Sequence, residues 1–265
     1  MSRARLVVIG GGNMGSALVG GLIDSGWDPA SVCVVEIDAD KRHQLAHTFG
    51  VQTSEVPVAA DGALVAVKPG DAAAACGAVA ALGVPRVLSI AAGVSVQTLE
   101  AAAGPTVAVV RAMPNTPALV GEGVTAICAG TSAGEHDLDW AESLLTAVGV
   151  VVRVPESQMD AVTAVAGSGP AYIFLLAESL LDAAQREGLP ADVAQVLVRQ
   201  LFRGSGILLA ESDDSPATLR EKVTSPNGTT AAGLAQFDAA GLREIVNKAV
   251  RAAAARSAEM GRATS

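Results

Sequence analysis

The chain has 265 residues, of which half are hydrophobic, with a formal net charge of −9 and an isoelectric point near 4.8. A chain of this length can bury one large or two smaller cores, and its acidity argues against nucleic acid and anionic membrane surfaces as partners. The three cysteines form no C-x-x-C pair, which favours reduced thiols in a cytoplasmic protein. The three histidines lack metal-ligand spacing, so we predict no metal site.

The first predicted element is a buried strand, Leu6–Ile9, which leads into a turn with the spacing G-x-G-x-x-G. Gly10 permits the tight turn, Gly12 lets a pyrophosphate approach the backbone, and Gly15 lets the next helix pack on the sheet. The free N–H groups and the dipole of that helix, about residues 16–25, would face the phosphates. The turn therefore predicts a dinucleotide site. The alternative is a strand-to-helix turn without a ligand.

Strands and helices alternate through the first half of the chain, which is typical of a parallel sheet covered by helices. We expect strands at 32–35, 63–67, 86–90, 107–111, 124–128 and 150–154, and helices at 40–49, 72–82 and 138–146. Beyond about residue 155 the pattern indicates only helices, at 159–188, 192–211, 215–223, 230–239 and 242–260. The prediction is an α/β fold: a Rossmann-type, doubly wound dinucleotide-binding domain over 1–157 and an all-α domain over 158–265.

The helices of the second half are apolar almost all round, as in Ile173–Leu176 followed by Leu180 and Leu181. Such helices must be buried on several sides, and a domain this small has too little core of its own to bury them. We therefore expect this domain to form an intertwined homodimer, with larger assemblies open. The alternative is a compact monomeric bundle. Every long apolar run is interrupted by glycine, proline or charge, so we expect no membrane span.

Charged residues follow the second predicted strand, where a dinucleotide's adenosine ribose would lie. Glu36 closes this strand, 21 residues after Gly15, and an acidic residue there binds the ribose hydroxyls and favours NAD. Lys41 and Arg42 come just beyond and are suited to a 2′-phosphate, which favours NADP, although they could equally be the solvated first turn of a helix. The two signals conflict, so NADP(H) and NAD(H) both stay open.

Three later strand ends supply further candidates for the ligand site. Lys68, in Val67-Lys68-Pro69, either contacts the cofactor or braces its loop, and the alternative is a surface lysine at a strand end without a ligand. Ala91 follows the next strand, and its small side chain leaves room for a nicotinamide ring or ribose. Asn115 lies in a loop fixed by two prolines and is placed to orient substrate or cofactor by hydrogen bonds.

Two polar turns interrupt the apolar second half. Gly167–Pro170 lies inside an otherwise helical stretch, and its two glycines and one proline cost about 4–5 kcal/mol by helix propensity. That cost indicates a close backbone approach, a kink, or packing against another helix. Thr224–Thr230 leads into a helix, and its hydroxyls with the helix N-terminus form an anion pocket suited to a carboxylate. The alternative for this second turn is a helix cap without a ligand.

Five motifs together resemble pyrroline-5-carboxylate reductases, in order and over the whole chain: Ile9–Gly15, Val67–Pro69, Arg111–Pro117, Ala166–Tyr172 and Val223–Thr230. The resemblance implies the last step of proline biosynthesis, in which NAD(P)H reduces 1-pyrroline-5-carboxylate to L-proline. It also implies a helical domain that interlocks in homodimers, often five dimers to a decamer. No catalytic triad or carboxylate pair is visible, which fits hydride transfer to an electrophilic C=N bond.

The resemblance also implies roles for individual residues. The substrate carboxylate would be held by the loop that contains Ser225, Asn227, Gly228, Thr229 and Thr230. As our own hypothesis, the imine ring docks between this loop and Gly167–Pro170, where Ser168 and Gly169 lie, and whether the two come from one subunit or two stays open. Thr230 would be the catalytic residue, hydrogen-bonded to the ring nitrogen. Asn227 stands where the family often has glycine, and asparagine tolerates positive φ, so the turn should survive. The cofactor-binding candidates are Gly10, Gly12, Asn13, Met14, Gly15, Glu36, Val67, Lys68, Pro69, Ala91 and Asn115.

Two other function classes compete with this interpretation. A β-hydroxy-acid dehydrogenase usually places a lysine on its long interdomain helix, but residues 159–189 contain none. A non-catalytic nucleotide sensor would keep the glycine turn and have no need of the second polar loop.

Overall fold

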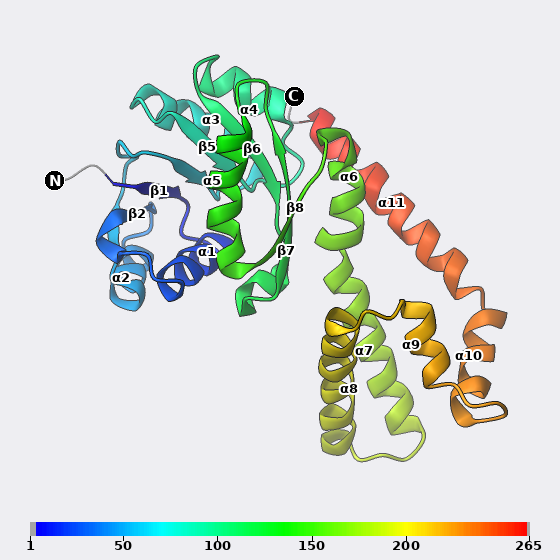
Figure 1. Ribbon diagram of the computed structural model, residues 1–265. Helices are drawn as coiled ribbons and strands as arrows, with labels where there is room; N and C mark the ends of the chain where they lie inside the picture. The colour runs from blue at the N-terminus through cyan, green and yellow to red at the C-terminus, as the bar shows by residue number, and fades with distance from the viewer. Residues whose placement is uncertain (1–3, 264–265) are drawn as a thin grey trace. The chain divides into compact units, whose positions relative to one another are not determined.

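The computed structural model describes residues 4–263, and its first compact unit is built on one mixed sheet (Figure 1). In space, the strands of this sheet follow the order β3-β2-β1-β4-β5-β6-β7-β8. The order along the chain reverses between β1 and β4, and ligands bind at such a switch point in open α/β sheets. The strands are β1 (Leu6–Ile9), β2 (Val32–Val35), β3 (Gln52–Ser54), β4 (Ala63–Val65), β5 (Arg86–Ser89), β6 (Ala108–Met113), β7 (Gly123–Ala129) and β8 (Gly149–Arg153).

Helices cover both faces of this sheet. One core lies under α1 (Asn13–Asp24), α2 (Ala39–Phe49) and α5 (Glu135–Leu145), and the other lies under α3 (Pro69–Ala81) and α4 (Val96–Ala103). Alternate β1 residues face opposite cores: Leu6 and Val8 face the first, and Val7 and Ile9 face the second. Strands buried on both faces must be apolar throughout, which explains the continuous apolar runs. The predicted doubly wound α/β fold is confirmed.

The sheet differs from the prediction in one pairing, because β7 runs antiparallel to β6. The connection between Met113 and Gly123 holds only a short 3₁₀ helix, η2 (Thr116–Val120), and is too short for a parallel crossover. Strand β8 then pairs parallel to β7. The prediction also lacked β3, which has only three residues, and α4.

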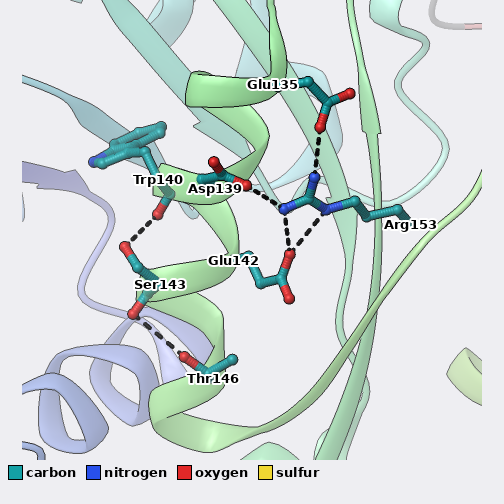
Figure 2. Close-up of polar contacts among 7 residues, drawn as sticks. All are labelled: Glu135, Asp139, Trp140, Glu142, Ser143, Thr146 and Arg153. Carbon is teal, nitrogen blue, oxygen red and sulfur yellow. Dashed lines mark hydrogen bonds and ion pairs between the residues drawn. The ribbon is translucent and has the colours of Figure 1, made fainter.

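Ion pairs hold the last strand against α5. The Arg153 guanidinium, at the end of β8, donates to carboxylates of Asp139 at 2.5 Å, Glu142 at 2.6 Å and Glu135 at 2.8 Å (Figure 2). Hydrogen bonds to Asp139 and Glu142 hold the pKa of Arg153 above its usual range. Since β8 ends the sheet order, this cluster braces a sheet edge.

The second compact unit, Gly169–Arg251, is entirely helical in its regular structure. Helices α7 (Gly169–Arg186) and α8 (Ala191–Glu211) pack side by side and are followed by α9 (Pro216–Lys222), α10 (Thr229–Ala239) and the first part of α11 (Leu242–Ala263) (Figure 1). Within this unit only Ala194 and Val198 are buried, whereas Phe174 is 65% exposed. An all-α unit with so little core must bury its apolar surface elsewhere.

The expected interruption at Gly167–Pro170 takes the form of a widened helical turn. Helix α6 (Met159–Val162) continues into a π-helix, Thr163–Gly167, and then into α7. A Cβ at Gly167 would lie 2.6 Å from Met113 Cε, so the turn is a place of close approach.

Candidate active site

The glycine turn has the local geometry that its spacing predicts. Gly10 has a φ of +106°, and a Cβ there would lie 2.6 Å from the carbonyl oxygen of Ala66 at the end of β4. A Cβ at Gly15 would collide with the carbonyl oxygen of Gly10. The tight turn at Gly10 and the close packing at Gly15 are therefore confirmed.

Gly12 differs from these two glycines, because no atom lies within 4 Å of the position that its Cβ would occupy. It is the N-cap of α1, and no side chain caps the N–H groups of the first turn. The turn borders one end of an open groove of about 660 Å³, which runs along α1 as far as Asp24 and is also lined by Lys41, but not by the residues at the ends of β4 and β5. Uncapped amides beside free space at a helix N-terminus suit an anionic group such as a pyrophosphate.

Glu36 lies where a ribose-binding acid is expected, directly after β2. Its Oε2 accepts the N–H of Gly11 at 3.2 Å, and its Oε1 accepts the N–H of Asp38 at 3.1 Å. Arg42 donates to the carbonyl oxygens of Glu36 at 2.7 Å and Ile37 at 2.9 Å, so its guanidinium braces this loop. The sequence analysis did not identify Gly11 as a site residue. Its N–H links the glycine turn to Glu36 by donating a hydrogen bond to the carboxylate.

The carboxyl ends of β4 and β5 lie at the same sheet edge as the glycine turn. The turn follows β1, and β1, β4 and β5 pair in parallel. Lys68 is the exposed N-cap of α3, and Pro69 is the first residue of that helix. Ala91 is buried just beyond β5. The end of α11 packs against this loop, because a Cβ at Gly93 would lie 3.3 Å from Met260 Cβ. The structure thus brings the candidates from four strand ends to one edge.

Asn115 is 9% exposed, and both ends of its side-chain amide bond to the protein. Its Oδ1 accepts the N–H of Val124 at 2.9 Å, and its Nδ2 donates to the carbonyl oxygen of Ala166 at 3.2 Å. Nearby, buried Arg111 donates to Glu156 Oε1 at 3.0 Å, and the same oxygen accepts the N–H of Val96 at 2.6 Å. The sequence did not indicate the Arg111–Glu156 pair, because its members lie far apart in the chain.

The second polar turn, in the helical unit, also has the expected backbone. Asn227 has a φ of +58° and is the one described non-glycine residue with positive φ, so the expectation that asparagine preserves this turn is confirmed. Gly228 is the N-cap of α10, without a side-chain cap, and a Cβ there would collide with the Ser225 hydroxyl. Thr229 and Thr230 are exposed in the first turn of α10. Hydroxyls and free amides at a helix N-terminus are suited to a carboxylate.

The three cysteines do not offer a reactive thiolate. Cys33, Cys76 and Cys128 are buried free thiols. Burial raises the pKa of Cys76 to about 12, and burial beside Glu156 raises that of Cys128 to about 11. Thiols with such pKa values stay protonated at neutral pH and are inert as nucleophiles.

Comparisons with known proteins agree with this geometry in both halves. Residues 5–93 match the family model described as "NADP oxidoreductase coenzyme F420-dependent", and residues 156–260 match "Pyrroline-5-carboxylate reductase dimerisation". The pyrroline-5-carboxylate reductase of Mycobacterium leprae is 42% identical, over 98% of this chain and 97% of its own. The pyrroline-5-carboxylate reductase of Synechocystis is 42% identical, over 97% of this chain and 98% of its own.

Solved structures give the same result. A pyrroline-5-carboxylate reductase from Coxiella burnetii superposes with a TM-score of 0.92 and 36% identity, over 98% of this chain and 99% of its own. The enzyme from Plasmodium falciparum, solved with NADP bound, superposes with a TM-score of 0.85 and 29% identity, over 98% and 99%.

Fold and site together define an NAD(P)-dependent oxidoreductase with a Rossmann-type domain and a helical dimerisation domain. The chain belongs to the pyrroline-5-carboxylate reductase family. Its activity is the reduction of 1-pyrroline-5-carboxylate to proline, in proline biosynthesis.

The family also explains the exposed apolar helices. The helical stretch Glu156–Arg186 is long and apolar enough to cross a membrane by length and composition alone. It falls within the matched dimerisation segment, so its apolar surface belongs to a homo-oligomer. The predicted homo-oligomer is therefore confirmed.

Proposed function

We propose that the nicotinamide cofactor binds along the edge formed by the ends of β1, β2, β4 and β5. The observation that carries this proposal is the space at Gly12, where a Cβ would meet nothing, beside the uncapped N-terminus of α1. Gly12, Asn13 and Met14 hold the pyrophosphate, while Gly10 and Gly15 shape the turn. Glu36 holds the adenosine ribose. The rest of the cofactor site is lined by Val67, Lys68, Pro69 and Ala91. When bound, the cofactor supplies a hydride to the imine carbon.

We propose that the substrate carboxylate is held at the N-terminus of α10. Ser225, Asn227, Gly228 and Thr229 offer it hydroxyls, backbone N–H groups and the positive end of a helix dipole. Ser168 and Gly169 bind the other side of the ring. Thr230 donates its hydroxyl hydrogen bond to the ring nitrogen, which gains electron density as the C=N bond is reduced. We propose residues 1–157 as the cofactor domain and 158–265 as the substrate and dimerisation domain.

We expect NADH to be the preferred cofactor. The Glu36 carboxylate at the end of β2 would repel a 2′-phosphate, and the Arg42 guanidinium already donates to two carbonyl oxygens of this loop. Glu36→Gln removes the negative charge and should shift the NADH-to-NADPH ratio of kcat/KM toward NADPH, on the order of tenfold. Initial rates with each cofactor measure the ratio.

Glu55→Gln is the matched control, since Glu55 is a second carboxylate near Arg42 that does not contact the glycine turn. This variant should keep the wild-type ratio. A wild type that prefers NADPH, with a ratio unchanged in Glu36→Gln, would remove Glu36 from cofactor choice.

We propose that the homo-oligomer is built from interlocked dimers, with five dimers to a decamer, in the cytoplasm. The buried free thiols fit a reducing compartment. Light scattering coupled to size exclusion should give a mass two or ten times that of the 26.4 kDa chain. A monomer at micromolar concentration would refute the dimer, and a stable dimer would refute only the decamer.

A further inference from the structure

Two motifs that lie far apart in the sequence meet in the first unit. The segment Met113–Asn115 begins at the last residue of β6, and the segment Ala166–Ser168 spans the end of the π-helix and its C-cap. The Asn115 amide spans between the β7 backbone, through the N–H of Val124, and the carbonyl oxygen of Ala166. Because Asn115 is 9% exposed, water competes little for these two hydrogen bonds.

The segment that Asn115 contacts has an unusual backbone. Thr163–Gly167 is π-helical, and the N–H of Ser168 donates to the carbonyl oxygen of Thr163 at 2.8 Å. π-Helical turns are rare and occur often at functional sites. One extra residue in a turn rotates the next residues of the helix by about 100° relative to a regular α-helix, since an α-helix has 3.6 residues per turn. The π turn therefore determines in which direction the backbone and side-chain groups of Ser168 and Gly169 point relative to the substrate.

The methionine contact at Gly167 cannot fix this turn by itself. A Cβ at Gly167 would approach the terminal methyl of Met113, which is the flexible end of a long side chain and can move away. Asn115 is short and buried, and it is anchored through Val124 to the start of β7, which pairs with the edge strand β8. It is therefore the rigid polar tie between the sheet and the π turn.

We propose that Asn115 is a positioning residue for the substrate: its amide holds the carbonyl of Ala166, fixes the π turn, and so sets the backbone of Ser168 and Gly169. The inference rests on the proposed substrate role of those two residues. Asparagine suits this position because its amide accepts from Val124 and donates to Ala166 at once. This role replaces a direct contact between Asn115 and the cofactor.

The test uses the full-length oligomer and the variant Asn115→Asp, which keeps the acceptor and the size but loses the donor when ionised. We expect the KM for 1-pyrroline-5-carboxylate to rise by about 5- to 30-fold, the loss expected for one buried hydrogen bond. The Kd for NADH should stay within about twofold of wild type, because the cofactor edge is unchanged. Thr116→Ala, at the exposed neighbouring position, should leave both values unchanged.

A pH profile separates positioning from general destabilisation. A protonated carboxyl can again donate to Ala166, so the KM ratio of Asn115→Asp to wild type should shrink as the pH falls. Asn115→Ser, whose short hydroxyl cannot reach both partners, should show the KM rise at every pH. Asn115→Ser also tests the proposal if the Asn115→Asp variant fails to fold.

Two results would overturn the proposal: an unchanged KM for the imine in both variants, or a rise in the NADH Kd that matches the rise in KM. The second would indicate a direct cofactor contact. If the wild type itself does not reduce the imine, the proposed substrate site fails, and the role of Asn115 fails with it.

Discussion

Replacing Gly12 with alanine should weaken NADH binding by about 5- to 150-fold, the effect of forcing a methyl group into an occupied space at a cost of about 1–3 kcal/mol. Apart from Gly12 and its two chain neighbours, nothing in the described structure lies within 4 Å of the added Cβ, and the backbone of Gly12, with φ −71° and ψ −177°, accepts any residue. The protein alone should tolerate the methyl group. Only a ligand in that space would be displaced. Fluorescence titration with NADH and a thermal melt measure the two effects.

Gly134→Ala is a closely matched control. Gly134 is also a helix N-cap, with φ −103° and ψ −174°, and its Cβ would meet nothing within 4 Å. It precedes α5, outside the cofactor edge, so this variant should bind NADH as the wild type does. Gly15→Ala gives the opposite contrast: its Cβ would collide with the Gly10 carbonyl, and the melting temperature should fall. Normal NADH binding by Gly12→Ala would place the pyrophosphate elsewhere.

Replacing Thr230 with valine should lower kcat/KM for the imine by about 5- to 150-fold, since one hydrogen bond to a group that gains charge contributes about 1–3 kcal/mol. Valine keeps the shape and removes only the hydroxyl. Thr230 is exposed in the first turn of α10, so the change should not disturb the fold of the chain. Steady-state rates with varied imine measure the effect, and NADH binding should not change.

Thr230→Ser keeps a hydroxyl and should recover most of the lost activity, which separates the hydrogen bond from packing. Equal losses in the serine and valine variants would indicate a packing role. A Thr230→Val enzyme with wild-type kcat/KM would take Thr230 out of the reaction.

Local patterns predicted most of the first unit, because its signals are short in range. The strand before Gly10 and the spacing to Gly15 depend on neighbouring residues, and β1 has the predicted bounds. Helix α4 was missed although it carries a local signal: Ser95 caps it by accepting the N–H of Thr98. Strand β3 has no comparable signal, since its three residues are polar and at least partly exposed.

Contacts between distant residues could not be predicted in the same way. The sequence suggested Asn115 as a ligand of substrate or cofactor, but its partner Ala166 lies 51 positions along the chain. The direction of β7 depends on the length of a connection, which a strand pattern does not report. Likewise, Gly167 and Pro170 indicated an interruption, whereas the π-helical form of that turn depends on what packs against it.

The most direct test of the account is the oxidation of NADH and NADPH by the purified oligomer with 1-pyrroline-5-carboxylate, followed through the absorbance of the reduced cofactor. We predict turnover that depends on the imine, yields proline and is faster with NADH. An oligomer that binds NADH but oxidises neither cofactor in the presence of the imine would contradict the account.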